Sequence, residues 1–169
     1  MKIILKSKKT KKLNKKEIES ICKLKNTHWN FGLRKQKKWF ENNIYNNDIH
    51  NLLIFKNKII GYTCLRERVF TDQKKIPKKY LHFDTLIINR KYRKFGLGYK
   101  LMIFNSKIIK NNFKPSFLIC KKEMFKFYKK YNWKLTKKNY FKKEDHKTHK
   151  RIMGFNFKLH NWSKTKIFI

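Results

Sequence analysis

The sequence predicts an α/β (α+β) fold in which helices pack on a mixed sheet. The predicted elements follow one another as a strand, two helices, three strands, a helix, a strand, a helix and two strands. The 169 residues suffice for one domain with a sizeable core. No internal repeat or linker-like segment interrupts them, so residues 1–169 are expected to form a single domain.

The first third of the chain predicts one strand and two helices. Residues 2–5 are a candidate strand. Asn14 has the position of an N-cap, with Glu17 at the third helical position. Apolar side chains then recur at helical spacing to about residue 30, namely Ile18, Ile21, Cys22 and Trp29. Gly32 interrupts this helix, and residues 34–44 form the second, whose expected buried side is Trp39, Phe40 and Ile44.

The middle of the chain predicts a hairpin and a further strand. Residues 52–55 and 59–70 are strands joined by a tight turn at 56–58, which is a hairpin signal. A polar loop at 71–79 precedes the next strand, residues 80–89.

The turn after this strand is a candidate phosphate site. Its sequence is Arg93-Lys-Phe-Gly96-Leu-Gly98, and a helix pattern follows at once, with Leu101, Phe104 and Ile108 on one face. A strand that ends in a glycine turn at a helix N-terminus directs several backbone N–H groups to one point, which suits a phosphate or pyrophosphate. A Cβ at either glycine would obstruct the ligand or forbid the required φ angle.

The last third of the chain predicts a buried strand at 116–120, a short helix at 122–132 and a closing hairpin. The inner side of the helix is expected to be Met124, Phe127 or Tyr128, and Tyr131. The hairpin would pair residues 133–141 with 151–158 around a loop that holds Glu144, Asp145, His146 and His149. Those histidines lack an evident third ligand, so no metal site is predicted.

Two of these segments together resemble the GNAT superfamily of acyl-CoA-dependent N-acyltransferases. Its first motif is Gln or Arg, two residues, Gly, one residue, and Gly or Ala, which Arg93 to Gly98 matches in full. Its second motif, Phe-Tyr-x-x-x-Gly-Phe, is matched by residues 127–133, with Asn132 and Trp133 replacing Gly and Phe. Asn tolerates the left-handed conformation that Gly normally supplies there. The resemblance is most specific over residues 80–135.

The resemblance implies the fold and the co-substrate of that family. The fold would be a mostly antiparallel mixed sheet of six to seven strands with about four helices, opened by a central splay that holds the pantetheine arm of acetyl-CoA. Main-chain groups of Leu86 and Ile88 would pair with pantetheine, and the Ile88 N–H would polarise the acetyl carbonyl. The implied phosphate-binding turn comprises Arg93, Lys94, Phe95, Gly96, Leu97, Gly98 and Tyr99. Lys121 stands where the family usually has an Asn that bonds the pantetheine region, which departs from the pattern.

Tyr128 is the candidate general acid. Acyl transfer to an amine requires a neutral amine, a donor for the oxyanion and a proton for the leaving thiolate. By the resemblance, Tyr128 occupies the position of the family's acidic tyrosine, and the ordinary tyrosine pKa near 10 is close to that of a thiol. The alternative is that Tyr128 only packs on its helix.

Asp84 is the candidate general base or amine anchor. It interrupts an apolar strand, and strict alternation would place residues 82, 84, 86 and 88 on one face. The alternative is a structural ion pair. His82 is a second candidate base, or else a surface histidine on an edge strand. Glu67 could belong to the acceptor site, although its position between Arg66 and Arg68 also suits an exposed row of charges.

The net charge of +36 raises nucleic acid as a possible partner. However, the lysines are spread along the chain, and Lys, Asn, Ile, Phe and Tyr are overused together, as A/T-rich codons would produce. The three cysteines, Cys22, Cys64 and Cys120, lack metal-ligand spacing and are expected to be reduced, buried thiols in a cytoplasmic protein. Cys120 could alternatively face the acyl site. No apolar run approaches the length of a membrane span.

The sequence is therefore interpreted as that of a cytoplasmic N-acetyltransferase, monomeric or homodimeric, that transfers an acetyl group from acetyl-CoA to a primary amine. The acceptor is expected to be a small molecule such as an amino sugar, an aminoglycoside-like amine or another metabolite. Two alternatives remain open: a protein N-acetyltransferase on the same fold, and a basic nucleic-acid-binding module without turnover.

Overall fold

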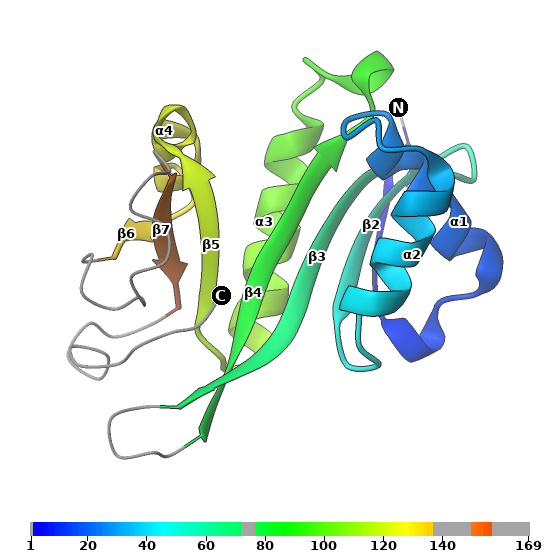
Figure 1. Ribbon diagram of the computed structural model, residues 1–169. Coiled ribbons are helices and arrows are strands. Elements are labelled where there is room, and N and C mark those ends of the chain that lie inside the picture. The colour runs from blue at the N-terminus through cyan, green and yellow to red at the C-terminus, as the bar shows by residue number, and fades with distance from the viewer. Residues whose placement is uncertain (1, 72–76, 137–149, 157–169) are drawn as a thin grey trace. The chain divides into compact units, whose positions relative to one another are not determined.

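The computed structural model describes residues 2–71, 77–136 and 150–156 of the chain. The strands are β1 (Ile4–Lys9), β2 (Ile49–Phe55), β3 (Lys58–Thr71), β4 (Pro77–Ile88), β5 (Ser116–Lys121), β6 (Lys134–Leu135) and β7 (Lys150–Phe155). The α-helices are α1 (Lys15–Asn26), α2 (Leu33–Asn43), α3 (Leu97–Asn111) and α4 (Phe125–Lys129). The described residues thus confirm the predicted α/β class and element order, and the strand order is β1-β2-β3-β4-β5-β7-β6 (Figure 1).

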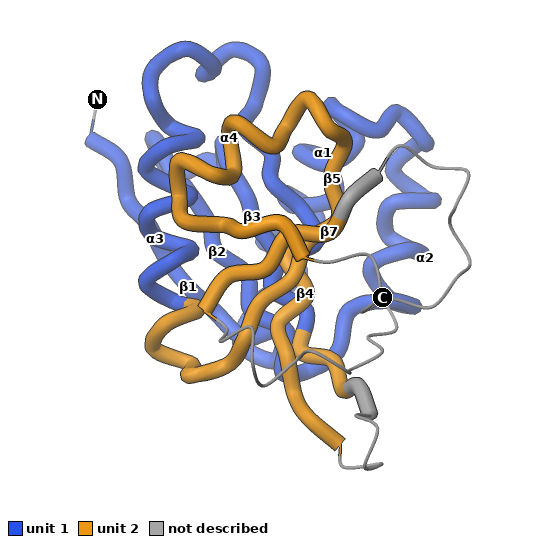
Figure 2. Tube along the Cα trace, turned by 90° about the vertical axis from the view of Figure 1, so that its left-hand side faces the viewer, with its two compact units in different colours: residues 1–66, 84–108 blue, residues 67–83, 109–169 orange. Residues whose placement is uncertain are grey.

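The chain divides into two compact units, each built from two segments (Figure 2). Unit 1 comprises residues 1–66 and 84–108, and unit 2 comprises residues 67–83 and 109–169. The boundaries fall within β3, β4 and α3. A single domain over residues 1–169 remains a prediction.

In unit 1, α1 and α2 lie on one face of the strands and α3 lies on the other (Figure 1). Two buried clusters hold these layers together. The cluster beneath α1 and α2 contains Ile21, Cys22, Leu24, Phe40, Ile44, Leu52, Tyr62, Cys64 and Ile87. The cluster beneath α3 contains Leu53, Ile60, Leu97 and Leu101. Adjacent residues of β2, Leu52 and Leu53, therefore serve opposite faces, as the two-residue period of a strand requires.

Local signals in unit 1 form the structures that the sequence predicts. The Asn14 Oδ1 accepts a hydrogen bond from the Glu17 backbone N–H at 2.8 Å, and the Glu17 carboxylate accepts one from the Asn14 N–H at 3.0 Å. This reciprocal pair satisfies two N–H groups at the start of α1. Between β2 and β3, Lys56 and Asn57 have φ angles of 45° and 59°, which suit a two-residue hairpin turn.

Unit 2 is built around aromatic side chains. Strand β5 pairs antiparallel with β7, which pairs antiparallel with β6, and β4 pairs parallel with β5 at Leu81–Ser116. The Trp133 ring is buried, with the ring centroids of Phe83 and Phe155 at 5.5 and 5.4 Å. The chain reaches Trp133 through Asn132, whose φ of 62° confirms the expected left-handed residue.

Several predicted boundaries were wrong. β1 spans Ile4–Lys9 rather than residues 2–5, because it pairs with β2 along its whole length. α1 ends at Asn26, so Trp29 belongs to the following loop. The helix predicted at 122–132 is a short 3₁₀ turn, Lys122–Met124, followed by α4. Residues 72–76, the loop with Glu144, Asp145, His146 and His149, and the hairpin ends at 137–141 and 157–158 lie outside the described residues.

Candidate active site

The glycine turn of unit 1 has the geometry of a ligand cradle. Gly96 has a φ of 67°, in the region that L side chains rarely adopt. α3 begins at Leu97, which is buried and so anchors the first turn of the helix. A Cβ built on Gly96 or Gly98 would meet no atom within 4 Å other than those of its chain neighbours and its own helix backbone. The protein therefore leaves this space open, and Gly98 is not required there by any close neighbour.

The cradle is fixed to the end of β4 by polar contacts. The Asn89 N–H donates to the Ile60 carbonyl at 2.8 Å, and the Asn89 side chain accepts from the Lys91 N–H at 3.0 Å. The Arg93 Nε donates to the Ile88 carbonyl at 3.2 Å. In this structure, Arg93 thus supports the turn by bonding the main chain of the preceding strand.

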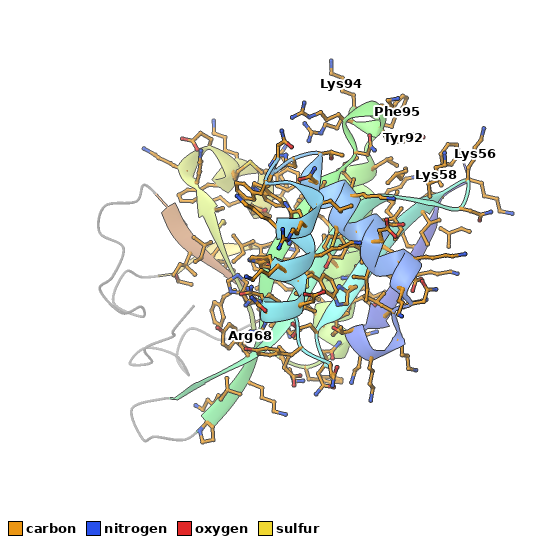
Figure 3. All side chains as sticks on the ribbon, turned by 45° about the vertical axis from the view of Figure 1, so that its right-hand side comes forward. Lys56, Lys58, Arg68, Tyr92, Lys94 and Phe95 are labelled. Carbon is orange, nitrogen blue, oxygen red and sulfur yellow. The ribbon has the colours of Figure 1, made fainter. Side chains whose placement is uncertain are left out.

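Basic side chains lie on the glycine turn and on the neighbouring β2–β3 turn. Figure 3 shows Lys94 and Phe95 projecting from the glycine turn, and Lys56 and Lys58 projecting from the β2–β3 turn. The two turns are linked by the rings of Phe55 and Tyr92, whose centroids lie 5.8 Å apart. The positive charges of these two turns favour a polyanionic ligand.

Leu86 and Ile88 pack against the cluster beneath α3, together with Leu97 and Leu101. Asp84 instead lies 4.0 Å from the Arg66 guanidinium, which stands over the Trp39 ring of α2. The prediction that residues 84, 86 and 88 share one face was therefore wrong. The Asp84 carboxylate lies on the α1–α2 side of the sheet, whereas Leu86 lies on the α3 side. The two-residue alternation of β4 is therefore broken between these residues.

On that side, unit 1 holds a cavity of about 440 Å³, called here the aromatic pocket. It is lined by Lys25 of α1, Trp29 and Phe31 of the α1–α2 loop, Gln36 and Trp39 of α2, and Asp84 of β4. Clefts with mainly apolar walls and a few convergent polar groups are typical ligand sites. Asp84 is the sequence-predicted site residue that contributes to it.

The loop that supplies two walls of the pocket is held in place by hydrogen bonds. The Gln36 Nε2 donates to the Trp29 carbonyl at 2.8 Å, and the Gly32 N–H donates to the Asn26 Oδ1 at 2.9 Å. Gly32 itself has a φ of 86°, which lets the chain turn from the loop into α2. These hydrogen bonds hold the loop that carries Trp29 and Phe31 in place against α1 and α2.

Lys25 is the feature of this pocket that the sequence interpretation missed. It is 5% exposed, and its ammonium lies 3.4 Å from the centroid of the Trp39 ring. Burial lowers the pKa of Lys25, and the charge of Asp84 acts in the opposite direction. The signal in the sequence was its spacing, because Lys25 continues the apolar stripe of Ile18, Ile21 and Cys22.

Tyr128 belongs to unit 2, where it is 8% exposed. Its ring packs edge-on against Phe83 and Trp133, with centroids 6.1 and 6.2 Å away. Burial, with a smaller contribution from Cys120, raises the pKa of Tyr128 well above its ordinary value. The hydroxyl is therefore a neutral hydrogen-bond donor at physiological pH. Its role as the general acid stays a prediction.

The remaining candidates lie outside the aromatic pocket. His82 occupies the part of β4 that pairs with Phe117 of β5. Glu67 of unit 2 has a side chain that is only 17% exposed and forms ion pairs with Lys114 and with Lys79, so it is not part of an exposed row of charges with Arg66 and Arg68. Burial raises the pKa of the Cys120 thiol to about 11, so it is a weak nucleophile at neutral pH. Cys22 and Cys64 are also buried, unbridged thiols.

Among the residues that the structure describes, no group of three or more His, Cys, Asp and Glu side chains could hold a metal ion. No helix formed by the described residues is long and apolar enough to cross a membrane.

Comparison with solved structures shows the fold of the GNAT acyl-CoA N-acyltransferases. An acyl-CoA N-acyltransferase from Pseudomonas aeruginosa matches with a TM-score of 0.67 at 13% identity, over 90% of this chain and 99% of its own. The PaiA N-acetyltransferase from Thermoplasma acidophilum, solved with coenzyme A, matches with a TM-score of 0.60 at 16% sequence identity. The match covers 93% of this chain and 100% of that protein's chain. Naa50 from Arabidopsis thaliana, solved with the bisubstrate analogue CoA-Ac-MVNAL, matches with a TM-score of 0.60 at 18% sequence identity. The match covers 90% of this chain and 99% of that protein's chain. No protein-family model and no curated protein sequence matches the chain.

Proposed function

We propose that this protein is an acyl-CoA-dependent N-acyltransferase that moves an acetyl group from acetyl-CoA to the primary amine of a small molecule. The observation that carries the proposal is the open glycine cradle at the start of α3, in a chain with the GNAT fold. Solved relatives of this fold hold coenzyme A, which supports the same co-substrate here.

Residues of unit 1 fit the polyanionic part of coenzyme A. The backbone N–H groups from Lys94 to Tyr99 would bind the pyrophosphate, because the cradle is open and borders a helix N-terminus. Lys56, Lys58 and Lys94 would add long-range attraction (Figure 3). Main-chain groups of Leu86 and Ile88 would pair with pantetheine, as the family resemblance implies.

The reaction is a direct transfer in a ternary complex. The neutral amine attacks the thioester carbonyl, a C–N bond forms, the C–S bond breaks, and the amine nitrogen loses one proton. We assign Asp84 to binding the amine and accepting that proton, with His82 as the second candidate. The Ile88 N–H would donate to the developing oxyanion, and Tyr128 would donate its proton or a hydrogen bond to the leaving thiolate.

The aromatic pocket is the proposed acceptor site, because it contains Asp84 and has room for a small molecule. A protein N-terminus is the second candidate acceptor, since Naa50 was solved with a bisubstrate analogue. We further propose that the enzyme acts in the cytoplasm, as a monomer or homodimer.

Thermal denaturation with and without acetyl-CoA tests the proposal. A ligand at 100 times its Kd stabilises the native state by about 2.7 kcal/mol, so the Tm should rise by several degrees. A basic module that binds only nucleic acid would show no shift with acetyl-CoA and a steep dependence of nucleic-acid binding on salt. That result would replace the enzyme proposal with the binding-module alternative.

A further inference from the structure

The charge inside the aromatic pocket limits which amines it can hold. Lys25 is buried there and Lys35, which also lines the pocket, is exposed, so one cation lies deep and the other near the solvent. The guanidinium of Arg66 lies beside Asp84, the carboxylate of the lining. The pocket lining thus carries two cationic side chains, Lys25 and Lys35, and one anionic side chain, Asp84, which already has Arg66 beside it.

The charge of Lys25 is poorly compensated by the protein. Among the described residues, no carboxylate lies within 4.0 Å of its ammonium, and its close contact is the Trp39 ring at 3.4 Å. A ring face offsets part of the cost of burying a cation, and an anion at hydrogen-bonding distance offsets more. A ligand carboxylate would supply that anion.

Asp84 has capacity for a hydrogen bond from the ligand. Its Oδ2 is buried without a hydrogen-bond partner, and so is the Arg66 Nε. The 4.0 Å separation between Asp84 and Arg66 is too long for a hydrogen bond between them. An ammonium or amine near Asp84 would satisfy this oxygen, which is unusual to find unpaired in a buried position.

The pocket is unsuited to a polycation. A cluster of acids would be needed to hold an aminoglycoside or a polyamine, and the other acidic candidate, Glu67, is occupied by ion pairs with Lys114 and Lys79 in unit 2. The walls formed by Trp29, Phe31 and Trp39 instead offer apolar surface for a large hydrocarbon group.

Building on the proposed function, we propose that the acceptor is an apolar amino acid or a close analogue, a molecule that carries an amine, a carboxylate and a large apolar group. The amine binds Asp84, the carboxylate binds Lys25 and Lys35, and the apolar group packs on Trp29 and Trp39. Lys25 is then the residue that determines acceptor specificity.

The test compares matched pairs that differ only in the carboxylate: phenylalanine with 2-phenylethylamine, tryptophan with tryptamine, and leucine with 3-methylbutylamine. Calorimetry on the protein saturated with coenzyme A measures each Kd, and spermidine is the polycationic probe. We expect at least one amino acid to bind about tenfold or more tightly than its decarboxylated partner, as one charge-assisted hydrogen bond provides. Spermidine should bind more weakly than that amino acid.

Lys25→Met removes the charge and keeps most of the length and the apolar stem of the side chain. It should reduce the preference for the carboxylate to about onefold, because the amino acid loses its cationic partner. Lys38→Met, on the exposed side of α2, is the matched control and should keep the full preference.

Three outcomes overturn the inference: no amino acid binds, each amine binds as tightly as its amino acid, or spermidine binds best. The Tm shift with acetyl-CoA separates these outcomes from failure of the proposed function. A protein that responds to acetyl-CoA but shows no carboxylate preference keeps its proposed activity and loses only this acceptor class.

Discussion

Gly98→Val tests the cofactor site with little expected effect on the fold. Apart from its chain neighbours and its own helix backbone, a Cβ at Gly98 meets no protein atom within 4 Å, and the φ of Gly98 lies outside the positive range where side chains are strained. Gly98 is the second residue of α3, and Val is a slightly better helix former than Gly. The free energy of unfolding should therefore change by less than about 0.5 kcal/mol.

The same substitution should greatly weaken coenzyme A binding. The valine methyl groups would occupy the space in which the pyrophosphate meets the backbone N–H groups. Each hydrogen bond from an N–H to a charged group contributes about 1.5–3 kcal/mol, so losing two weakens binding by about 10² to 10⁴-fold. Gly98→Ala, which adds a single methyl group, should have a smaller effect in the same direction.

Gly96→Ala provides the contrasting control. Gly96 has a φ of 67°, so a side chain there strains the turn even though the space around it is open. The variant should lose about 1 kcal/mol of stability, which Gly98→Val should not. Calorimetry with coenzyme A and thermal denaturation of both variants measure the two quantities. An unchanged coenzyme A affinity in Gly98→Val would refute the phosphate cradle.

Three further predictions concern the catalytic groups and one buried histidine. Asp84→Asn should lower turnover by about 10²-fold or more. The loss should be smaller at high pH, where free amine is abundant. An unchanged rate would mean that Asp84 serves only as a structural ion-pair partner of Arg66. Tyr128→Phe should lower kcat and leave the Kd for acetyl-CoA unchanged. A wild-type rate across the pH range would mean that Tyr128 contributes only to packing. Burial, then the nearby Lys25 charge, lowers the pKa of His50 to about 4. Since the unfolded chain binds a proton near pH 6.5, stability should fall by about 3 kcal/mol as pH drops from 6.5 to 4, and His50→Gln should remove this part of the pH dependence in denaturant titrations.

Features that depend on a few neighbouring residues could be predicted from the sequence. The Asn14 cap, the turn at Lys56 and Asn57 and the left-handed Asn132 each follow from the local preferences of those side chains. The glycine turn was found for the same reason, because its two glycines and the following helix are contiguous. These signals are the basis for the cofactor side of the proposed site, which stays a prediction.

The acceptor side could not be predicted in the same way. The prediction that Asp84 shares a face with Leu86 assumed a regular strand, whereas Ile87 belongs to the cluster beneath α1 and α2, on the same side as Asp84. The two-residue period does not hold from residue 84 to residue 87. Tertiary packing decides on which face of the sheet the Asp84 carboxylate lies, so a local sequence pattern could not predict it.

Lys25 shows how an irregularity in a regular pattern can carry functional information. A lysine at a buried position of an amphipathic helix reduces stability unless something compensates its charge, and an apolar residue would fit the stripe of α1 better. The Trp39 ring gives partial compensation, and Asp84 is already beside Arg66. The charge is therefore most favourable when an anion occupies the aromatic pocket. Lys25→Met should therefore stabilise the ligand-free protein while it weakens the binding of the amino-acid acceptor, a trade-off that a purely structural lysine would not produce.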